Sequence, residues 1–191
     1  VYPVEDTPHP NYDNPFVASP EEYEKVANIK PFDPTDPKQA PRMSMHIELC
    51  KKLIQWNPDV PVVAFVYGPL GILSMMRGAE KLFLECFTHK AEVKAALRTI
   101  TDILKEYVKA LCDTGVPGIC YDCLYGSQTI MSAKMWEEME APFAKELADL
   151  AREKGKLVIM HNCGNGPYFD VQDKWMNLDA YSFADLPPDC K

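Results

Sequence analysis

The sequence has few positive charges for its size and no long apolar segment. Its 191 residues include 20 lysines and arginines against 28 acids, which gives a formal net charge of −8. With no basic run, the chain lacks the positive field by which proteins grip nucleic acid or anionic membranes. No apolar stretch reaches the roughly 18–20 residues that span a bilayer, and the first residues lack the regions of a signal peptide. We therefore expect a cytoplasmic protein that binds neither nucleic acid nor membrane.

Several short motifs with known chemistry are also missing. No G-x-G-x-x-G and no Walker-type glycine loop follows an apolar segment, which disfavours nucleotide binding. The absence of G-x-S-x-G disfavours a serine hydrolase of the α/β type, and no pair of carboxylates stands out. The seven cysteines form an odd number without the spacing of a secreted disulfide framework. We expect them to be reduced.

Prolines are concentrated in residues 1–41, which hold nine of the 17 in the chain. Because proline fixes φ and removes a hydrogen-bond donor, we expect this segment to be a mostly irregular arm that packs on the rest of the protein. Within it, Ser19-Pro20-Glu21-Glu22 predicts a short helix, since it offers an N-cap serine, a proline at the first helical position and a glutamate placed for a capping box.

Beyond the arm, in residues 42–191, short apolar segments alternate with helical patterns. The segments are nearly continuously apolar, which is typical of parallel strands that are covered on both faces. We expect adjacent parallel strands at residues 60–66, 117–122, 156–161 and 179–184.

Helical patterns fill the first two intervals between these strands. Apolar residues recur every three or four positions from 89 to 113, and Gly115 stands where that helix should stop. We also expect a helix over residues 42–56, a short helix capped by Ser132, and a longer helix that Pro142 opens and Gly155 ends.

This alternation predicts an α/β fold, either a barrel or an open doubly wound sheet. The missing nucleotide-binding motifs favour a (β/α)₈ TIM barrel. Such a barrel needs eight strands and roughly 250 residues, whereas this chain offers four or five strands. We therefore expect an incomplete barrel, an internal fragment with parallel strands and outer helices.

The segment His161-Asn162-Cys163-Gly164 closes one of the predicted strands. In an extended strand, residues i and i+2 project from the same face, so His161 and Cys163 should point into one cavity. Zinc binds imidazole and thiolate together, and a catalytic zinc uses three protein ligands and keeps one position open. The pattern therefore predicts half of a zinc site. The other interpretation of so short a motif is a histidine satisfied beside a buried thiol.

Polar residues also follow the other predicted strands. Since the carboxyl ends of barrel strands meet at one face, we expect these residues to converge there. Asp122 directly follows an apolar strand, where an acid is costly unless it meets a metal, a cation or a substrate. Its alternative role is an exposed loop acid or a helix cap. The remaining candidates at these ends are Tyr67, Gly68, Tyr121, Ser182 and Asp185.

The remaining cysteines and histidines carry weaker signals. Cys120 and Cys123 form a C-x-x-C across a strand end, and no second such pair completes a structural zinc site. We interpret Cys120 as a core residue and leave Cys123 open. We expect His9, His46 and His89 on the surface.

Taken together, the motifs resemble the superfamily of uroporphyrinogen decarboxylase and its cobalamin-dependent methyltransferases. The resemblance covers most of the chain. It rests on Ser19-Pro20-Glu21-Glu22-Tyr23, Tyr67-Gly68-Pro69-Leu70, Gly115 with Asp122, Met131-Ser132-Ala133, Ala141-Pro142-Phe143, and His161-Asn162-Cys163-Gly164.

Within that superfamily, H-x-C with a distant second cysteine marks the methyltransferase branch, which includes methylcobamide:coenzyme M methyltransferases and corrinoid-linked demethylases. The resemblance implies a zinc-dependent methyltransferase that moves a methyl group between a corrinoid (methylcobalamin), carried by a partner corrinoid protein, and a thiol or a methoxylated or methylated substrate. It implies His161 and Cys163 as metal ligands and Asp122 as a catalytic residue. The third ligand should lie beyond Lys191, because Cys190 is too close.

Two alternatives stay open. One is a metal-free lyase of the uroporphyrinogen decarboxylase type, in which Asp122 steadies a positive charge on a pyrrole. The other is a non-catalytic relic that only binds a corrinoid protein. For either enzyme, we expect substrate contacts from the strand-end residues Tyr67, Gly68, Tyr121, Ser182 and Asp185.

Overall fold

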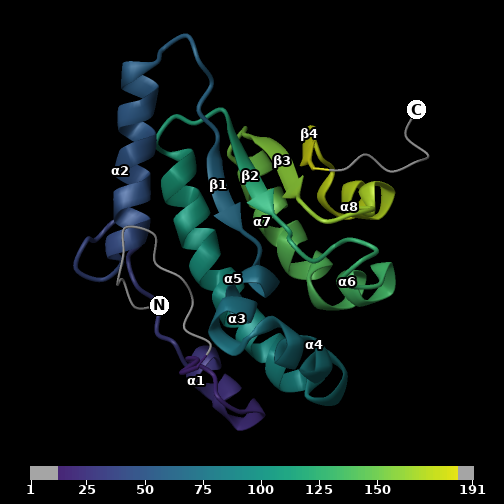
Figure 1. The fold of residues 1–191 in the computed structure, drawn as a ribbon. Coiled ribbons are helices and arrows are strands. Elements are labelled where there is room, and N and C mark those ends of the chain that lie inside the picture. The colour runs from purple at the N-terminus through teal and green to yellow at the C-terminus, as the bar shows by residue number, and fades with distance from the viewer. Residues whose placement is uncertain (1–12, 185–191) are drawn as a thin grey trace.

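The computed structural model describes residues 13–184. Four strands form one sheet, all parallel and in chain order β1-β2-β3-β4 (Figure 1). This confirms the predicted set of adjacent parallel strands. The strands are β1 (Ala64–Tyr67), β2 (Gly118–Asp122), β3 (Leu157–Asn162) and β4 (Ala180–Phe183).

Strand β1 begins four residues later than the sequence predicts. Pro61 has no N–H to donate to a ladder, so the apolar run around it enters the sheet only after the proline. The other three strands agree with the prediction to within one residue at each end.

Eight helices and one 3₁₀ turn occur within residues 13–184. The predicted helices at 42–56 and 89–113 are present as α2 and α5, and Gly115, in the left-handed region at φ 98°, lies just beyond α5. The short helix α8 was not predicted. The elements are η1 (Pro20–Glu22), α1 (Tyr23–Ala27), α2 (Pro41–Trp56), α3 (Pro69–Arg77), α4 (Ala79–Thr88), α5 (Lys90–Cys112), α6 (Ala133–Met139), α7 (Ala141–Glu153) and α8 (Phe169–Met176).

The two predicted N-caps differ in outcome. The Ser132 side chain accepts a hydrogen bond from the Met135 N–H at 3.2 Å, as expected for the cap of α6. Ser19 does not cap η1, because its hydroxyl donates instead to the Glu21 carboxylate at 2.6 Å. Glu22 accepts from the N–H of Ala18 at 2.8 Å, so the reciprocal bond of a capping box is displaced by one residue.

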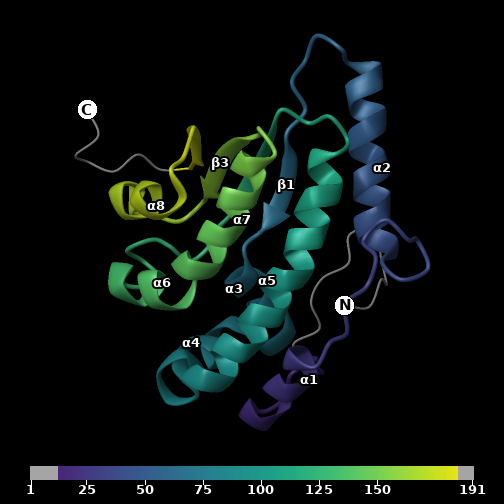
Figure 2. The same cartoon turned by 180° about the vertical axis from the view of Figure 1, so that it is seen from behind.

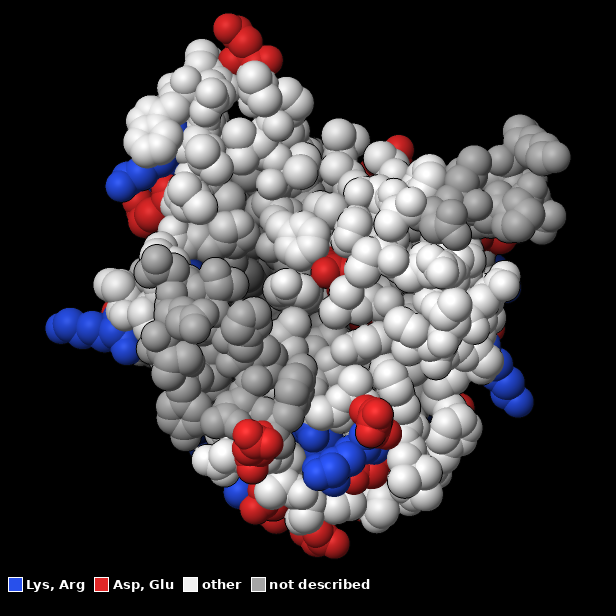
Figure 3. All heavy atoms as spheres, viewed as in Figure 1, with Lys and Arg blue, Asp and Glu red and all other residues white. Residues whose placement is uncertain are grey.

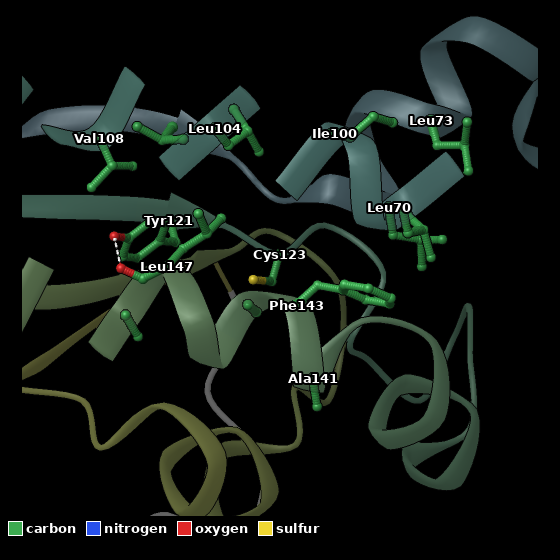
Figure 4. Packing of buried hydrophobic residues seen from close by; sticks show 14 of the residues in the cluster. Leu70, Leu73, Ile100, Leu104, Val108, Tyr121, Cys123, Ala141, Phe143 and Leu147 are labelled. Atoms are coloured by element: carbon green, nitrogen blue, oxygen red, sulfur yellow. Dashed lines mark hydrogen bonds between the residues drawn. The ribbon is translucent and has the colours of Figure 1, made fainter. Parts of the chain in front are cut away.

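Helices α5 and α7 pack on one face of the sheet (Figure 2). Apolar residues of both helices meet the outward side chains of the strands in a continuous core, part of which is seen in Figure 4. Each fully buried leucine or isoleucine contributes about 1.5–3 kcal/mol to this packing. The core of the helix layer includes Val93, Leu97, Ile100, Leu104, Val108, Leu111, Phe143 and Leu147.

The other face of the sheet, turned toward the viewer in Figure 1, carries aromatic and aliphatic side chains that stay partly exposed. Phe65 and Tyr67 of β1 are 40% and 41% exposed, and Leu157 at the start of β3 is 49% exposed. In the same view, charged side chains are sparse over the middle of this face and gather toward its rim (Figure 3). In a complete barrel this inner face is filled by side chains of eight strands. The fold is thus part of a (β/α)₈ barrel.

The described part of the arm is fixed to the helix layer. Helix α1 packs against α5, and the Thr99 hydroxyl donates to the Ala27 carbonyl at 3.0 Å. A buried ion pair of α3 and α4 lies next to the arm: Arg77 donates to both oxygens of Glu85, at 2.9 and 2.6 Å. Tyr23 of α1 donates to the same carboxylate at 2.6 Å.

Candidate active site

Four of the predicted site residues form one row across the carboxyl ends of the strands. The register pairs Tyr67 with Asp122, Asp122 with His161, and His161 with Ser182. Paired residues of neighbouring parallel strands project from the same face of the sheet. The row therefore lies on the open face, where the sequence predicts convergence.

Asp122 is the most deeply buried member of the row, with 4% of its surface exposed. Its Oδ1 atom has no hydrogen-bond partner within the described residues. Burial raises the pKa of Asp122 to about 6, and the nearby His161 opposes that rise. The alternative role as an exposed loop acid or helix cap is wrong, because Asp122 is the last residue of β2 and is buried.

His161 is half-buried, and its imidazole is held from one side. Its Nδ1 atom shares a hydrogen bond of 2.9 Å with the Ser182 hydroxyl, which leaves Nε2 as the ring nitrogen available to a ligand. The ring centroid of Phe65 lies 6.1 Å away. Strands β1 and β4 thus both contribute to the position of this imidazole.

Cys163 is exposed and lies one residue beyond the end of β3. The strict alternation of an extended strand therefore stops just before the thiol, and a turn through Gly164 and Gly166 follows. The predicted pairing with His161 depends on how this turn is held.

Tyr121 and Asp185 do not join the row. Tyr121 precedes Asp122 in the same strand and so points to the opposite face, where its hydroxyl donates to the Leu147 carbonyl at 2.6 Å (Figure 4). The structure thus places its fully buried side chain in the helix layer, away from the candidate substrate face. Asp185 lies outside the described residues.

Gly68 follows β1 and closes onto β2. Its N–H donates to the Asp122 carbonyl at 2.8 Å, which ties the turn into α3 to the end of β2. A Cβ atom on this residue would lie 2.5 Å from Oε1 of Glu140, so the position has room only for glycine. Gly68 therefore serves to let the backbone after β1 come close to the end of β2.

Glu140 is a second acid at this end of the sheet, and the sequence analysis missed it. It lies between α6 and α7, is fully buried, and accepts a hydrogen bond from the Trp136 indole N–H at 3.0 Å. Its Oε1 has no partner within residues 13–184. Burial raises the pKa of Glu140 to about 8, the Asp122 charge adds to the rise, and the Trp136 and Leu70 N–H groups oppose it. No pair of carboxylates stands out in the sequence, but the structure brings Asp122 and Glu140 close enough for the charge of one to affect the pKa of the other.

The cysteines and histidines outside this site differ in burial. Cys120 is buried, as expected, and Cys123 is fully buried, which raises its pKa well above the ordinary value. All six cysteines within residues 13–184 are free thiols. His46 is half-buried and bonded to the Tyr107 hydroxyl, so its expected surface position is wrong; burial lowers its pKa. His9 lies outside the described residues.

The side chains present suit part of a zinc site. Imidazole and thiolate are donors that zinc prefers, and the unpartnered oxygen of Asp122 lies on the same sheet face as His161. Within residues 13–184, no three His, Cys, Asp or Glu side chains gather closely enough to hold a metal ion. Zinc binding by His161 and Cys163 stays a prediction.

A parallel sheet in chain order, with outer helices and polar groups at the carboxyl ends of its strands, is the architecture of part of a (β/α) barrel. The chain belongs to the uroporphyrinogen decarboxylase (URO-D) family, which residues 1–186 match.

Among solved structures, the chain is similar to a methyltransferase from Methanosarcina mazei, with 20% identity and a TM-score of 0.57. The likeness covers 68% of this chain and 37% of that chain, and at this identity it shows a shared fold. No curated protein matches the sequence. None of the helices described here is both long and apolar enough to cross a membrane.

Proposed function

We propose that the complete protein is a zinc-dependent methyltransferase that moves a methyl group between a corrinoid and a thiol or a methoxylated or methylated substrate. The observation that carries this proposal is the position of His161 at the carboxyl end of β3, paired with Asp122 of β2, and of Cys163 just beyond that strand end. A third protein ligand would come from outside residues 13–184, and a corrinoid protein would be the partner.

The side chains at this end of the sheet have distinct tasks in this proposal. His161 binds through Nε2, because Ser182 holds Nδ1, and Cys163 binds as the thiolate. Bound zinc supplies the positive charge that keeps a substrate thiol deprotonated or polarises a substrate oxygen. Asp122 has a free oxygen that can accept a hydrogen bond from substrate or from the metal-bound group. Phe65 and Tyr67 give the site an apolar wall.

A second candidate is a metal-free lyase of the decarboxylase type. The buried, unpartnered Oδ1 of Asp122 favours it, since such an oxygen can stabilise positive charge that develops on a substrate ring. This reaction needs neither His161 nor Cys163 as a ligand.

Metal analysis of the complete protein after dialysis separates the two candidates. We expect about one zinc per chain, lost in the Cys163→Ala and His161→Ala variants. His89→Ala is the matched histidine control, because His89 lies at the start of α5, and Cys50→Ala is a cysteine control in α2; both should retain the metal.

The activity test is thiol-dependent loss of the methyl group from methylcobalamin, followed by the absorbance of the corrinoid. Activity should disappear with zinc in the Cys163→Ala variant. Full zinc occupancy in that variant, or decarboxylase activity in metal-free protein, contradicts the proposal.

A further inference from the structure

Asn162 stands between the two proposed ligands and is fully buried at the end of β3. Its side chain makes two hydrogen bonds with the backbone on either side of the site. The amide Nδ2 donates to the Cys123 carbonyl at 2.8 Å, and Oδ1 accepts from the Gly164 N–H at 2.8 Å. Asn162 therefore joins the end of β2 to the residue immediately after Cys163.

The loops that follow β2 and β3 are held together along their length. The N–H of Gln128 donates to the Gly166 carbonyl at 3.0 Å, and Ser127 and Pro167 form an antiparallel bridge. At Gly164, a Cβ atom would lie 2.3 Å from the Ser127 hydroxyl oxygen. The turn that carries Cys163 thus has a buried anchor at its start and a close backbone contact after it.

These contacts fix the backbone around the exposed thiol of Cys163. Cys163 lies outside the strand ladder, so the sheet alone does not fix its backbone. A metal-ligating side chain on an unfixed loop loses affinity, since groups behind the ligands commonly change metal affinity 10–100-fold. Both polar ends of the Asn162 amide are used, and no other side-chain type of that length donates and accepts in this way.

We infer that Asn162 is the positioning residue for Cys163: by bridging the Cys123 carbonyl and the Gly164 N–H it fixes the turn that presents the thiol beside His161. The inference rests on the proposed zinc function for its metal readout. It also predicts a property of the metal-free protein, which is protection of the Gly164 amide from solvent exchange.

The experiment uses the complete protein and the Asn162→Ala variant. Zinc affinity, measured by competition with a chromogenic chelator, should weaken about 10–100-fold in the variant. Hydrogen exchange in the metal-free protein should accelerate at least tenfold at Gly164, while the amides of β2 and β3 keep their protection. Asn165→Ala is the matched control, because Asn165 is exposed in the same turn, and neither quantity should change.

Two further variants keep the test decisive if Asn162→Ala fails to fold. Asn162→Asp retains the acceptor for the Gly164 N–H but loses the donor to Cys123, and it should weaken zinc binding less than alanine. Gly164→Ala keeps Asn162 and forces Ser127 away, so it should weaken binding to a similar extent.

The outcomes distinguish this inference from the proposed function. If the wild-type protein binds zinc and the folded Asn162 variants bind it equally well, the positioning role is overturned and the function stands. If the wild-type protein binds no zinc, the proposed function fails, and unchanged exchange at Gly164 would overturn the positioning role as well.

Discussion

Asp122 and Glu140 are two acids withdrawn from water at the same end of the sheet, for different purposes. Asp122 lies in the row on the open face, where the proposed function has it accept a hydrogen bond from substrate or from a metal-bound group. Glu140 is sealed beneath the turn after β1 and touches Gly68. A buried carboxyl without a cation is costly in its charged form, so the raised pKa keeps Glu140 protonated near neutral pH.

The proton on Glu140 makes stability depend on pH. Its pKa rises from an ordinary 4.5 to about 8 on folding, so between those values the folded state binds more protons than the unfolded state. Stability should therefore fall as pH rises through this window, by at most about 1.4 kcal/mol per pH unit. Glu140→Gln should abolish this component. Urea unfolding at intervals from pH 5 to 8 measures it, with exposed Glu48→Gln as control; equal slopes in Glu140→Gln and wild type would refute the role.

The contact between Gly68 and Glu140 gives a second prediction. Gly68→Ala places a Cβ 2.5 Å from Glu140 Oε1 and 3.1 Å from the Asp122 carbonyl, so it should destabilise the protein by about 1–3 kcal/mol. Gly71→Ala is the control, since its Cβ would meet only a flexible side chain at 3.6 Å inside helix α3. There the change should be neutral or stabilising by up to about 1 kcal/mol. Chemical denaturation compares the two, and equal effects would contradict the prediction.

At the residue scale, the sequence identifies residues at strand ends but does not tell which side chains are buried or which face of the sheet they occupy. Asp122 and His161 were found because they follow apolar runs, and parallel strands bring such residues together. The prediction puts Tyr121 on the same face as Asp122 because both end the same strand, but adjacent residues of a strand point to opposite faces. Glu140 sits in a run of helix acids that look solvated, and only tertiary packing decides that this one is buried.

At the scale of elements, the arm is attached through a polar network in addition to apolar packing. Arg77, at the end of α3, is buried with Glu85 of α4, and Tyr23 of α1 completes the carboxylate's bonds. Arg77 also donates to the Ala18 carbonyl at 3.1 Å. One carboxylate thus connects α1, α3 and α4.

Removing that carboxylate should loosen the arm. Glu85→Ala leaves the Arg77 charge buried and unpaired and should cost about 3–5 kcal/mol. Tyr23→Phe removes one hydrogen bond and should cost about 0.5–1.5 kcal/mol. Glu48→Ala, which breaks the exposed pair with Lys51, is the control and should cost about 1 kcal/mol or less. Thermal unfolding ranks the variants, and a Glu85→Ala loss no larger than the control would exclude this role.

Elements with a strong local sequence pattern could be predicted, and elements without one could not. Helix α5 was found because its apolar stripe is long, and α6 because Ser132 caps it. Helix α8 has only eight residues and a mixed composition, so its burial against α7 comes from the tertiary fold. The start of β1 was misjudged because an apolar run does not tell where pairing begins.

At the scale of the whole molecule, the sheet is covered by helices on one face and carries exposed apolar side chains on the other. Phe65, Tyr67 and Leu157 line that second face, and β1 is at one edge of the sheet. Exposed apolar surface and an unpaired strand edge both favour association.

We therefore expect the 191-residue chain to self-associate as its concentration rises. Leu157→Lys places a charge on the open face and should shift the equilibrium toward monomer by at least tenfold in the association constant. Leu84→Lys is the control, since Leu84 is similarly exposed on helix α4, away from the sheet. Sedimentation equilibrium measures both variants. Identical behaviour of Leu157→Lys and wild type would show that this face is not the contact.

Strands β2, β3 and β4 each pair with the strand that comes directly before them in the chain. On the ribosome, β2 can therefore dock on β1 as soon as β2 itself has emerged after α5, and β3 and β4 each find the preceding strand already in place. Within residues 13–184, each strand pairing joins strands that are consecutive in the chain. Synthesis from the amino end thus follows the same direction as the growth of the sheet, and a pause after β2 or β3 leaves an intermediate whose strands are already paired.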